Sequence, residues 1–138
     1  MLSKSVEYAL KSLILIKDRF DKTQTCIGVI EINTTLDIPK HFTAKILQTL
    51  VRHEYIKSTK GPGGGFTPDN YSKTLRELIV SIDGSFKFDK CVLGLENCSD
   101  STPCPLHTEY KILKKDLICS MFDKSILDIC NSPNKILK

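Results

Sequence analysis

Three of the six cysteines in this 138-residue chain lie close together in sequence, at Cys91, Cys98 and Cys104. His107 follows the third of them by three positions. Thiolate sulfur combined with imidazole nitrogen suits zinc or an iron-sulfur cluster. Structural zinc ligands are usually paired two to four residues apart, so the gaps of six and five residues between these cysteines slightly favour a cluster. Unrelated free thiols stay open as an alternative.

The number of cysteines also bears on the compartment. Free thiols are normal in reducing compartments, so six cysteines in a cytoplasmic chain would indicate metal binding or redox sensing instead of a disulfide framework. The N-terminal segment carries Lys4, Glu7 and Lys11, unlike a secretory signal, and no apolar run approaches the roughly 18 residues of a membrane span. We therefore expect a cytoplasmic protein without a membrane partner. Cys26, Cys119 and Cys130 lie in or near apolar helical patterns and are predicted to be small buried hydrophobic residues.

Positive charge is concentrated in one part of the chain. The net charge is +4, which by itself points only weakly to an anionic partner. Residues 40–60 alone contain five basic side chains against the single acidic residue Glu54. The partner of this segment is therefore expected to be anionic.

Helical periodicity covers most of the first half. It predicts a helix over residues 5–17 capped by Ser3 or Ser5, a short apolar stretch over 27–32, and a helix from Pro39 to about His53. In this last helix an apolar face is predicted for Phe42, Ile46, Leu47 and Leu50. The opposite face carries Lys40, His41, Lys45, Gln48 and Arg52. On an isolated helix such a face would more often be an ordinary solvated surface.

A glycine-rich hairpin follows. Residues 55–59 and 66–68 have strand character and flank the run from Gly61 to Gly65, which contains four glycines and Pro62. A basic helix followed by a glycine-tipped hairpin is typical of a winged helix-turn-helix, in which the second helix of the motif enters the DNA major groove. The DNA-contacting residues predicted from this order are Lys40, His41, Lys45, Gln48, Arg52, Lys60, Gly61, Gly63 and Gly64.

The second half is predicted to contain two further helices and a loop. Thr74 and Glu77 form a capping-box pattern for a helix that ends at Gly84, and residues 91–105 show little periodicity. From position 106 a long helix is predicted, with a short terminal turn over 125–130. Its apolar seam, which is the candidate dimerisation surface, consists of Leu106, Tyr110, Leu113, Leu117 and Met121.

These elements predict a mainly α fold with a small β wing, a winged helix-turn-helix joined to a long C-terminal dimerisation helix. We expect four segments along the chain. They are a DNA-binding domain over residues 1–84, a cysteine-containing cluster loop over 85–105, a dimerisation helix and terminal turn over 106–131, and a tail over 132–138.

The chain resembles the iron-sulfur cluster regulator family, which includes IscR, NsrR and CymR. The resemblance covers about residues 1–130 and depends on the three cysteines and on four short motifs. The motifs are Glu7-Tyr8-Ala9-Leu10, Leu36-Asp37-Ile38-Pro39, Lys60-Gly61-Pro62-Gly63-Gly64-Gly65-Phe66 and Asp83-Gly84. The wing motif is the most specific of them. The resemblance implies a homodimer joined through the long helix and bound to double-stranded DNA at a palindromic operator.

The resemblance also implies that Cys91, Cys98 and Cys104 hold an iron-sulfur cluster, with 2Fe-2S favoured over 4Fe-4S. His107 occupies the position of the IscR-type fourth ligand, and Glu7 occupies the position of the acidic NsrR-type ligand, which the partner subunit can supply. Three departures stand out: the first cysteine gap is six residues where IscR has five, a lysine replaces the wing arginine, and Ala44 replaces a glutamate that discriminates operators in IscR.

The sequence therefore predicts a DNA-binding regulator, expected to be a repressor, whose affinity for DNA depends on a cluster sensitive to redox state or nitric oxide. No catalytic set is evident, so we expect no enzymatic activity. Three alternatives stay open: a regulator of the same fold that senses thiol oxidation without metal, a structural zinc protein using its winged helix for protein contacts, and an electron-transfer protein. CymR-like relatives lack the cysteines, so the fold alone does not require a cluster.

Overall fold

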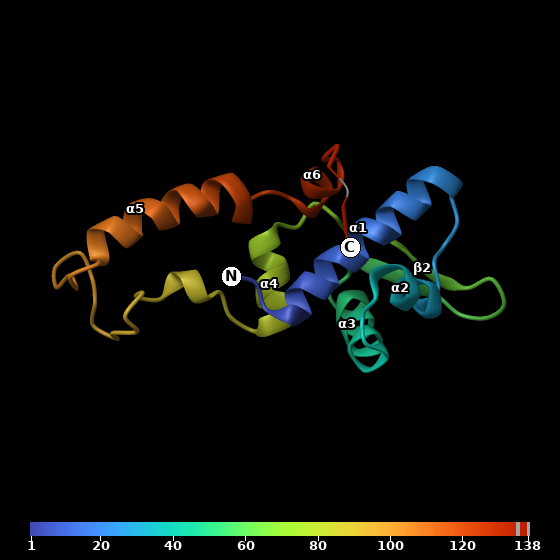
Figure 1. The fold of residues 1–138 in the computed structure, drawn as a ribbon, viewed down its shortest axis with the longest axis horizontal. Helices are drawn as coiled ribbons and strands as arrows, with labels where there is room; N and C mark the ends of the chain where they lie inside the picture. Colours follow the sequence, from blue (N-terminus) through green and yellow to red (C-terminus); the bar gives the residue numbers. More distant parts are fainter. Residues whose placement is uncertain (135, 138) are drawn as a thin grey trace.

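A computed structural model describes residues 1–134 and 136–137. The elements are α1 (Lys4–Thr23), α2 (Val29–Leu36), α3 (Lys40–Arg52), β1 (Ile56–Thr59), β2 (Gly65–Pro68), α4 (Leu75–Asp83), η1 (Lys87–Asp89), α5 (His107–Leu117), η2 (Ile118–Phe122) and α6 (Ile126–Cys130). Figure 1 shows two parts: a body that contains α1–α4 and the hairpin, and an arm in which the cysteine loop and α5 extend away from it. Among these residues, no helix combines the length and apolar character that crossing a membrane requires.

Helix α1 is the central element of the body. Its apolar face is fully buried at positions such as Leu13 and Ile16, and the side chain of Ser3 caps its first turn by accepting from Val6 N–H. The helix ends six residues beyond the end that the sequence pattern predicted. The added turns are polar, and the (i, i+4) ion pairs Lys17–Asp21 and Lys22–Asp18 support them. Apolar periodicity cannot detect turns of this kind.

Helices α2 and α3 form the helix-turn-helix. The turn between them contains Asp37 in the left-handed conformation, followed by Pro39, which caps α3 instead of occupying its first turn. Ile27, assigned to the apolar stretch before the turn, lies outside α2 and forms an isolated bridge with Phe66, while Ile30 is exposed. Periodicity indicated an apolar stretch here but did not give the bounds of α2.

The wing is the antiparallel hairpin of β1 and β2, with Ile56 opposite Pro68 and Thr59 opposite Gly65. Two of its glycines are required by close backbone approach. A Cβ on Gly64 would lie 2.2 Å from the carbonyl oxygen of Thr59, and a Cβ on Gly65 would lie 2.6 Å from that of Ile27. The glycine run thus folds the tip and lets the wing pack against the segment before α2.

Helix α4 has the predicted ends. The Thr74 hydroxyl accepts from Glu77 N–H, the Glu77 carboxylate accepts from Thr74 N–H, and Gly84 caps the C-terminus in the left-handed conformation. Beyond Gly84, the rings of Phe86, Phe88 and Phe122 pack on one another with centroids 4.9–5.3 Å apart. This aromatic cluster joins the start of the arm to its end.

The long C-terminal helix is shorter and less regular than predicted. Helix α5 starts at His107 and passes into the π-helical turn η2 at Ile118. That turn lets Phe122 bury completely, and Leu117 and Met121 pack against the core of their own chain. Leu106 and Leu113 stay exposed, together with Ile112, which the seam did not include. The predicted seam is therefore divided between the core and the surface.

The terminal turn predicted over residues 125–130 is present as α6, which hydrogen-bonds back to the body through Ile126 N–H and the Lys73 carbonyl. The predicted loose tail is only partly described, because Lys135 and Lys138 lie outside the described residues. Within it, Leu137 packs against the core. At least this residue of the tail is therefore in contact with the folded body.

Candidate cluster site and nucleic-acid interface

The three cysteines predicted as ligands meet at the far end of the arm. The Sγ atoms of Cys91, Cys98 and Cys104 all lie within 4.8 Å of one another, and those of Cys91 and Cys104 are 3.7 Å apart. Two thiolates on one tetrahedral metal ion are about 3.8 Å apart when each metal–sulfur bond is about 2.3 Å. The Cys91–Cys104 pair therefore has the separation that a shared metal ion requires.

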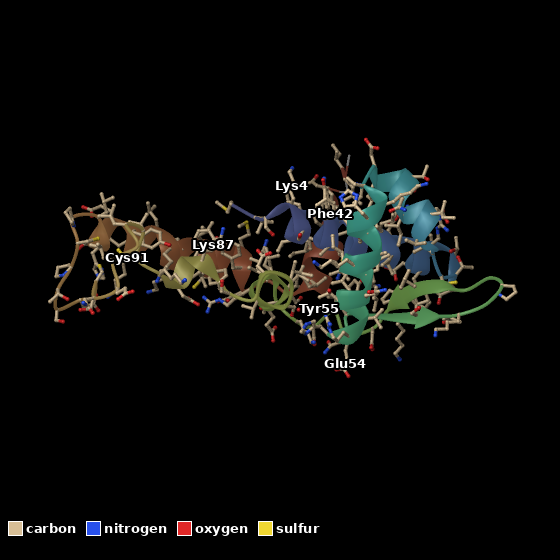
Figure 2. All side chains as sticks on the ribbon, turned by 90° about the horizontal axis from the view of Figure 1, so that it is seen from below. Lys4, Phe42, Glu54, Tyr55, Lys87 and Cys91 are labelled. Atoms are coloured by element: carbon tan, nitrogen blue, oxygen red, sulfur yellow. The ribbon has the colours of Figure 1, made fainter. Side chains whose placement is uncertain are left out.

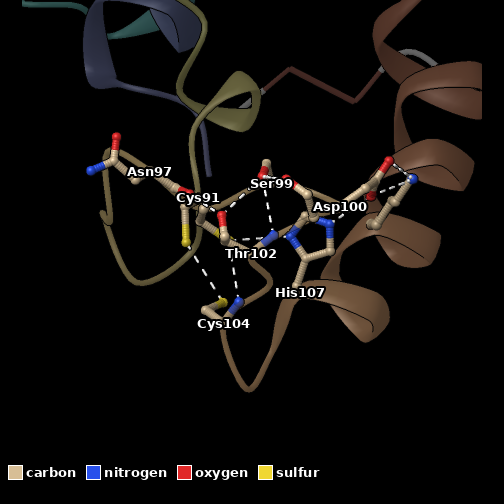
Figure 3. A network of polar contacts seen from close by, with 10 residues as sticks. Cys91, Asn97, Ser99, Asp100, Thr102, Cys104 and His107 are labelled. Atoms are coloured by element: carbon tan, nitrogen blue, oxygen red, sulfur yellow. Dashed lines mark hydrogen bonds and ion pairs between the residues drawn. The ribbon is translucent and has the colours of Figure 1, made fainter.

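His107 lies beside this group, at the first turn of α5. Its Nδ1 is 3.2 Å from Cys98 Sγ, and its Nε2 is 2.9 Å from Oδ1 of Asp100 (Figure 3). Asp100 also accepts from Lys111 Nζ at 2.7 and 2.8 Å through its two carboxylate oxygens. Sequence reasoning named His107 but missed Asp100 and Lys111. The spacing of His107 and Lys111 is helical (i, i+4), whereas nothing in the sequence pattern singles out Asp100.

The loop that carries Cys98 and Cys104 is held in shape by its own hydrogen bonds. The Thr102 hydroxyl donates to the Asn97 carbonyl at 2.7 Å, and the Thr102 and Ser99 hydroxyls are 3.0 Å apart (Figure 3). The Cys104 N–H donates to Cys98 Sγ at 3.4 Å. Amide donors to sulfur tune iron-sulfur centres, so this contact suits a thiolate ligand.

The thiols differ in acidity. Hydrogen bonds from the backbone, that of Leu95 foremost, lower the pKa of Cys91 to about 7. The Cys104 amide lowers the pKa of Cys98, but burial and the two neighbouring thiols outweigh this effect, so the net pKa of Cys98 is raised. Cys91 is therefore the thiol of this pair that is more readily ionised.

This difference predicts an order of alkylation in the reduced, metal-free protein. At pH 7, iodoacetamide should modify Cys91 about fivefold or more faster than Cys98, because only the thiolate is an effective nucleophile. Peptide mass spectrometry of timed, quenched samples gives both rates. Faster modification of Cys98 would contradict the assignment.

A cavity of about 540 Å³ adjoins the cysteines and is lined by Cys91, Cys98, Asp100, His107 and Lys111, among others. The site thus has three sulfur donors, one imidazole and open space beside them, and these residues fit a cluster or a single metal ion. Glu7, predicted as an alternative ligand, forms an ion pair with Lys4 in the body at 2.9 Å. It lies outside the group of cysteines within this chain, and as a ligand from a partner subunit it stays a prediction.

The other three cysteines were predicted to be buried. Cys130 is buried, but Cys119 is exposed, so this prediction was wrong for Cys119. It was also wrong for Cys26, which is only partly buried and donates its thiol proton to the Gly63 carbonyl at 2.9 Å. Cys119 lies in the π-helical turn η2, which buries Phe122 and leaves Cys119 on its exposed side.

The second candidate surface is the outer face of α3. The five residues predicted for DNA contact, namely Lys40, His41, Lys45, Gln48 and Arg52, are all exposed. The buried face consists of Thr43, Ile46, Leu47 and Leu50. Phe42 is only half-buried: its ring packs against Tyr8, with centroids 5.8 Å apart, and against His41 at 4.5 Å. The basic face is therefore accessible to a partner, and the contact with the Phe42 ring restricts the side chain of His41.

Helix α3 and the wing share a groove. A cavity of about 530 Å³ is lined by Gln48 and Arg52 from α3, by Lys60 beside the wing tip and by Phe66 from β2. Figure 2 shows α3 and the hairpin side by side at one end of the molecule, with Cys91 at the other. The residues predicted from two separate motifs therefore line one surface, and an exposed cationic helix is an element that can enter the DNA major groove. Gly61 and Gly63 lie exposed at the tip.

The chain matches the family model of Rrf2, described as an iron-dependent transcriptional regulator, over residues 2–132. The matched span includes the helix-turn-helix, the wing and the three clustered cysteines. The chain belongs to the Rrf2 family. Rrf2 proteins are transcriptional regulators and not enzymes, so this chain is a transcriptional regulator of the winged-helix type. The predicted family and the absence of an enzymatic role are thereby confirmed.

Individual relatives agree with this assignment. A protein of Aquifex aeolicus (strain VF5), named as an HTH-type transcriptional regulator, is 29% identical over 143 residues, covering 99% of this chain and 96% of the relative. Among solved structures, CymR of B. subtilis, the global cysteine regulator, has a TM-score of 0.75 at 15% identity and covers 97% of this chain and 98% of its own. T. potens IscR has a TM-score of 0.66 at 15% identity, covering 94% and 85%. These structures confirm the predicted mainly helical fold with its two-stranded wing.

Proposed function

We propose that this Rrf2 protein regulates transcription through an iron-sulfur cluster held by Cys91, Cys98, Cys104 and His107, and that the state of the cluster sets its affinity for DNA. The observation that carries the proposal is the convergence of three Sγ atoms within 4.8 Å, with an imidazole nitrogen 3.2 Å from one of them. When bound, a cluster would supply sensitivity to oxidants and nitric oxide. We expect a repressor that works in the cytoplasm.

The arrangement of the donors favours 2Fe-2S over 4Fe-4S. They fall into two close pairs, Cys91 with Cys104 at 3.7 Å and Cys98 with His107 at 3.2 Å. Each iron of a 2Fe-2S centre takes two protein ligands, so two pairs match two irons. The same four donors would also satisfy one tetrahedral zinc ion, so metal analysis has to separate these two assignments.

The position of the site suggests how it would act on DNA. Cys91 follows η1, close to the aromatic cluster of Phe86, Phe88 and Phe122, whereas His107 begins α5. A metal group bound to both Cys91 and His107 would connect the segment that follows η1 to the start of α5. Its loss would free α5 to change its angle to the body, a local change that biases a two-state protein.

We further propose that α5 joins two copies of the chain into a homodimer that reads a palindromic operator. The support is an exposed apolar surface on a helix with no buried residue of its own: Leu106, Ile112 and Leu113 are 47%, 59% and 68% exposed. Exposed apolar surface of this kind marks an interaction site. Two α3 helices held by one dimer would meet successive major grooves.

Leu113→Asp tests this dimer. An aspartate in an apolar interface pays a desolvation cost, so the dimer dissociation constant should rise by about thirtyfold or more. Sedimentation velocity over a concentration series measures it. Leu127→Asp, on α6 and 39% exposed, is the matched control and should dimerise normally. Equal dimerisation of Leu113→Asp and the wild type would place the interface elsewhere.

A second candidate function is thiol sensing without a metal. The observation that favours it is the Cys91–Cys104 pair, whose sulfur atoms are 3.7 Å apart and whose Cys91 pKa is lowered to about 7. A reactive thiolate next to a second thiol is the usual arrangement of a redox-sensing cysteine. Such a regulator would still bind DNA through α3 and the wing.

Anaerobic purification followed by a visible spectrum and iron, sulfide and zinc analysis separates these possibilities. Visible charge-transfer bands with about two irons and two sulfides per chain would support the 2Fe-2S proposal. One zinc per chain without colour would identify a structural zinc site and overturn it. A colourless protein without iron or zinc would leave the thiol-sensing regulator.

A further inference from the structure

We propose that Asp100, anchored by Lys111, is a positioning residue that holds His107 as the tautomer protonated on Nε2 and so presents Nδ1 as the ligating atom. This inference rests on the proposed function in that it names how the fourth ligand of the same site is selected. It concerns three residues of this chain, and part of it can be tested without a cluster.

The geometry is a continuous chain of contacts across the site. Cys98 Sγ lies 3.2 Å from His107 Nδ1, and His107 Nε2 lies 2.9 Å from Asp100 Oδ1. The same carboxylate accepts from Lys111 Nζ at 2.7 and 2.8 Å. Figure 3 shows the imidazole of His107 beside Asp100, with one ring nitrogen facing that carboxylate.

The chemistry of the donors fixes the tautomer. An ionised carboxylate can only accept hydrogen bonds, so the imidazole nitrogen that faces Asp100 must carry the proton. In a neutral imidazole the other nitrogen then has a free lone pair, and that nitrogen is Nδ1, beside Cys98. A metal-binding histidine that donates to a carboxylate is held in one ring orientation and becomes a more basic ligand.

Lys111 explains why this carboxylate stays in place. It lies one turn beyond His107 on α5, so both side chains project from the same helix face toward Asp100. Asp100 is 72% exposed and comes from a loop, where an isolated carboxylate would sample several rotamers. Two hydrogen bonds to one ammonium group restrict it. An exposed lysine–aspartate pair adds little to stability, so its effect should appear in the histidine and not in the fold.

The tautomer can be read directly in the reduced, metal-free protein. With ¹⁵N-labelled histidine, long-range ¹H–¹⁵N spectra at pH 8 should show a protonated Nε2 and an unprotonated Nδ1 for His107. Asp100→Ala should give a mixture of tautomers, whereas Asp116→Ala, an exposed position near the C-terminal end of the same helix, should match the wild type. A protonated Nδ1 in the wild type would overturn the proposal. This result does not depend on whether a cluster binds.

Metal affinity provides the second test, with Co²⁺ alone as the probe. Asp100→Ala should weaken Co²⁺ binding by about 10- to 100-fold and shift the ligand-field bands, the usual range for losing the carboxylate partner of a ligating histidine. Asp100→Glu should restore much of the affinity, and Asp116→Ala should change neither quantity. Unchanged affinity and bands in Asp100→Ala would overturn the positioning role. Failure of the wild type to bind Co²⁺ would instead count against the proposed metal centre, while the tautomer spectra would still decide the role of Asp100.

Discussion

Cys98→Ala is expected to purify anaerobically without colour and with less than about a tenth of the iron and sulfide of the wild type. Cys98 is central to the site because its sulfur lies 3.2 Å from His107 Nδ1 and accepts the Cys104 amide at 3.4 Å. Alanine removes one of four donors and leaves one iron without a protein thiolate, and each lost ligand exposes the cluster to solvent. Iron and sulfide assays with a visible spectrum measure the loss.

Cys119→Ala is the matched control for this prediction. Cys119 is an exposed thiol on the same arm but lies outside the group of three sulfur atoms. It should retain full iron content and an unchanged spectrum. Should Cys98→Ala keep its iron while Cys119→Ala loses it, the ligand assignment would be wrong. Circular dichroism of both proteins checks that the fold is intact.

Removing two positive charges from the groove between α3 and the wing is expected to weaken binding to duplex DNA strongly. Arg52 and Lys60 line the same groove and are both exposed. If each neutralises one phosphate, Arg52→Ala combined with Lys60→Ala should reduce the slope of log K against log salt by about 1.8 and lower affinity roughly 60-fold at 0.1 M salt. Because this electrostatic contribution does not depend on sequence, a mixed-sequence duplex is sufficient.

Fluorescence anisotropy across a salt series provides both quantities. The control is Lys87→Ala combined with Lys90→Ala, which removes the same charge from exposed positions at the base of the arm. It should leave the slope unchanged. Equal slopes for the groove variant and the wild type would show that DNA binds elsewhere on the surface.

The fold of the body was predictable because its signals are local. The capping box at Thr74 and Glu77, the left-handed Gly84 and the glycine run of the wing each specify a turn or a helix end from adjacent residues. The exposed face of α3 followed from helical periodicity alone. By contrast, the last turns of α1 are polar and depend on ion pairs such as Lys17–Asp21, so an apolar pattern ended that helix too early.

The arm was predicted less well because its structure depends on contacts far apart in sequence. The π-helical turn at Ile118 buries Phe122 against Phe86 and Phe88, and a heptad-like seam continues through that position without any local sign of a break. The ligand candidates Cys91, Cys98, Cys104 and His107 were identified from residue type and spacing. Asp100 was not identified, because nothing in the sequence distinguishes this aspartate from others in polar loops. Only the structure shows that it lies beside His107.

Control of DNA binding by the cluster is tested by comparing the cluster-loaded and cluster-free forms of the protein on a specific operator. Duplexes selected from a random pool by the cluster-loaded protein supply that operator, and anaerobic anisotropy titrations measure both dissociation constants at one salt concentration. The two constants are expected to differ by tenfold or more, while affinities for mixed-sequence DNA stay alike, because the cluster alters how the two α3 helices are spaced and not their charge. Equal dissociation constants on the selected operator would contradict control of DNA binding by the cluster.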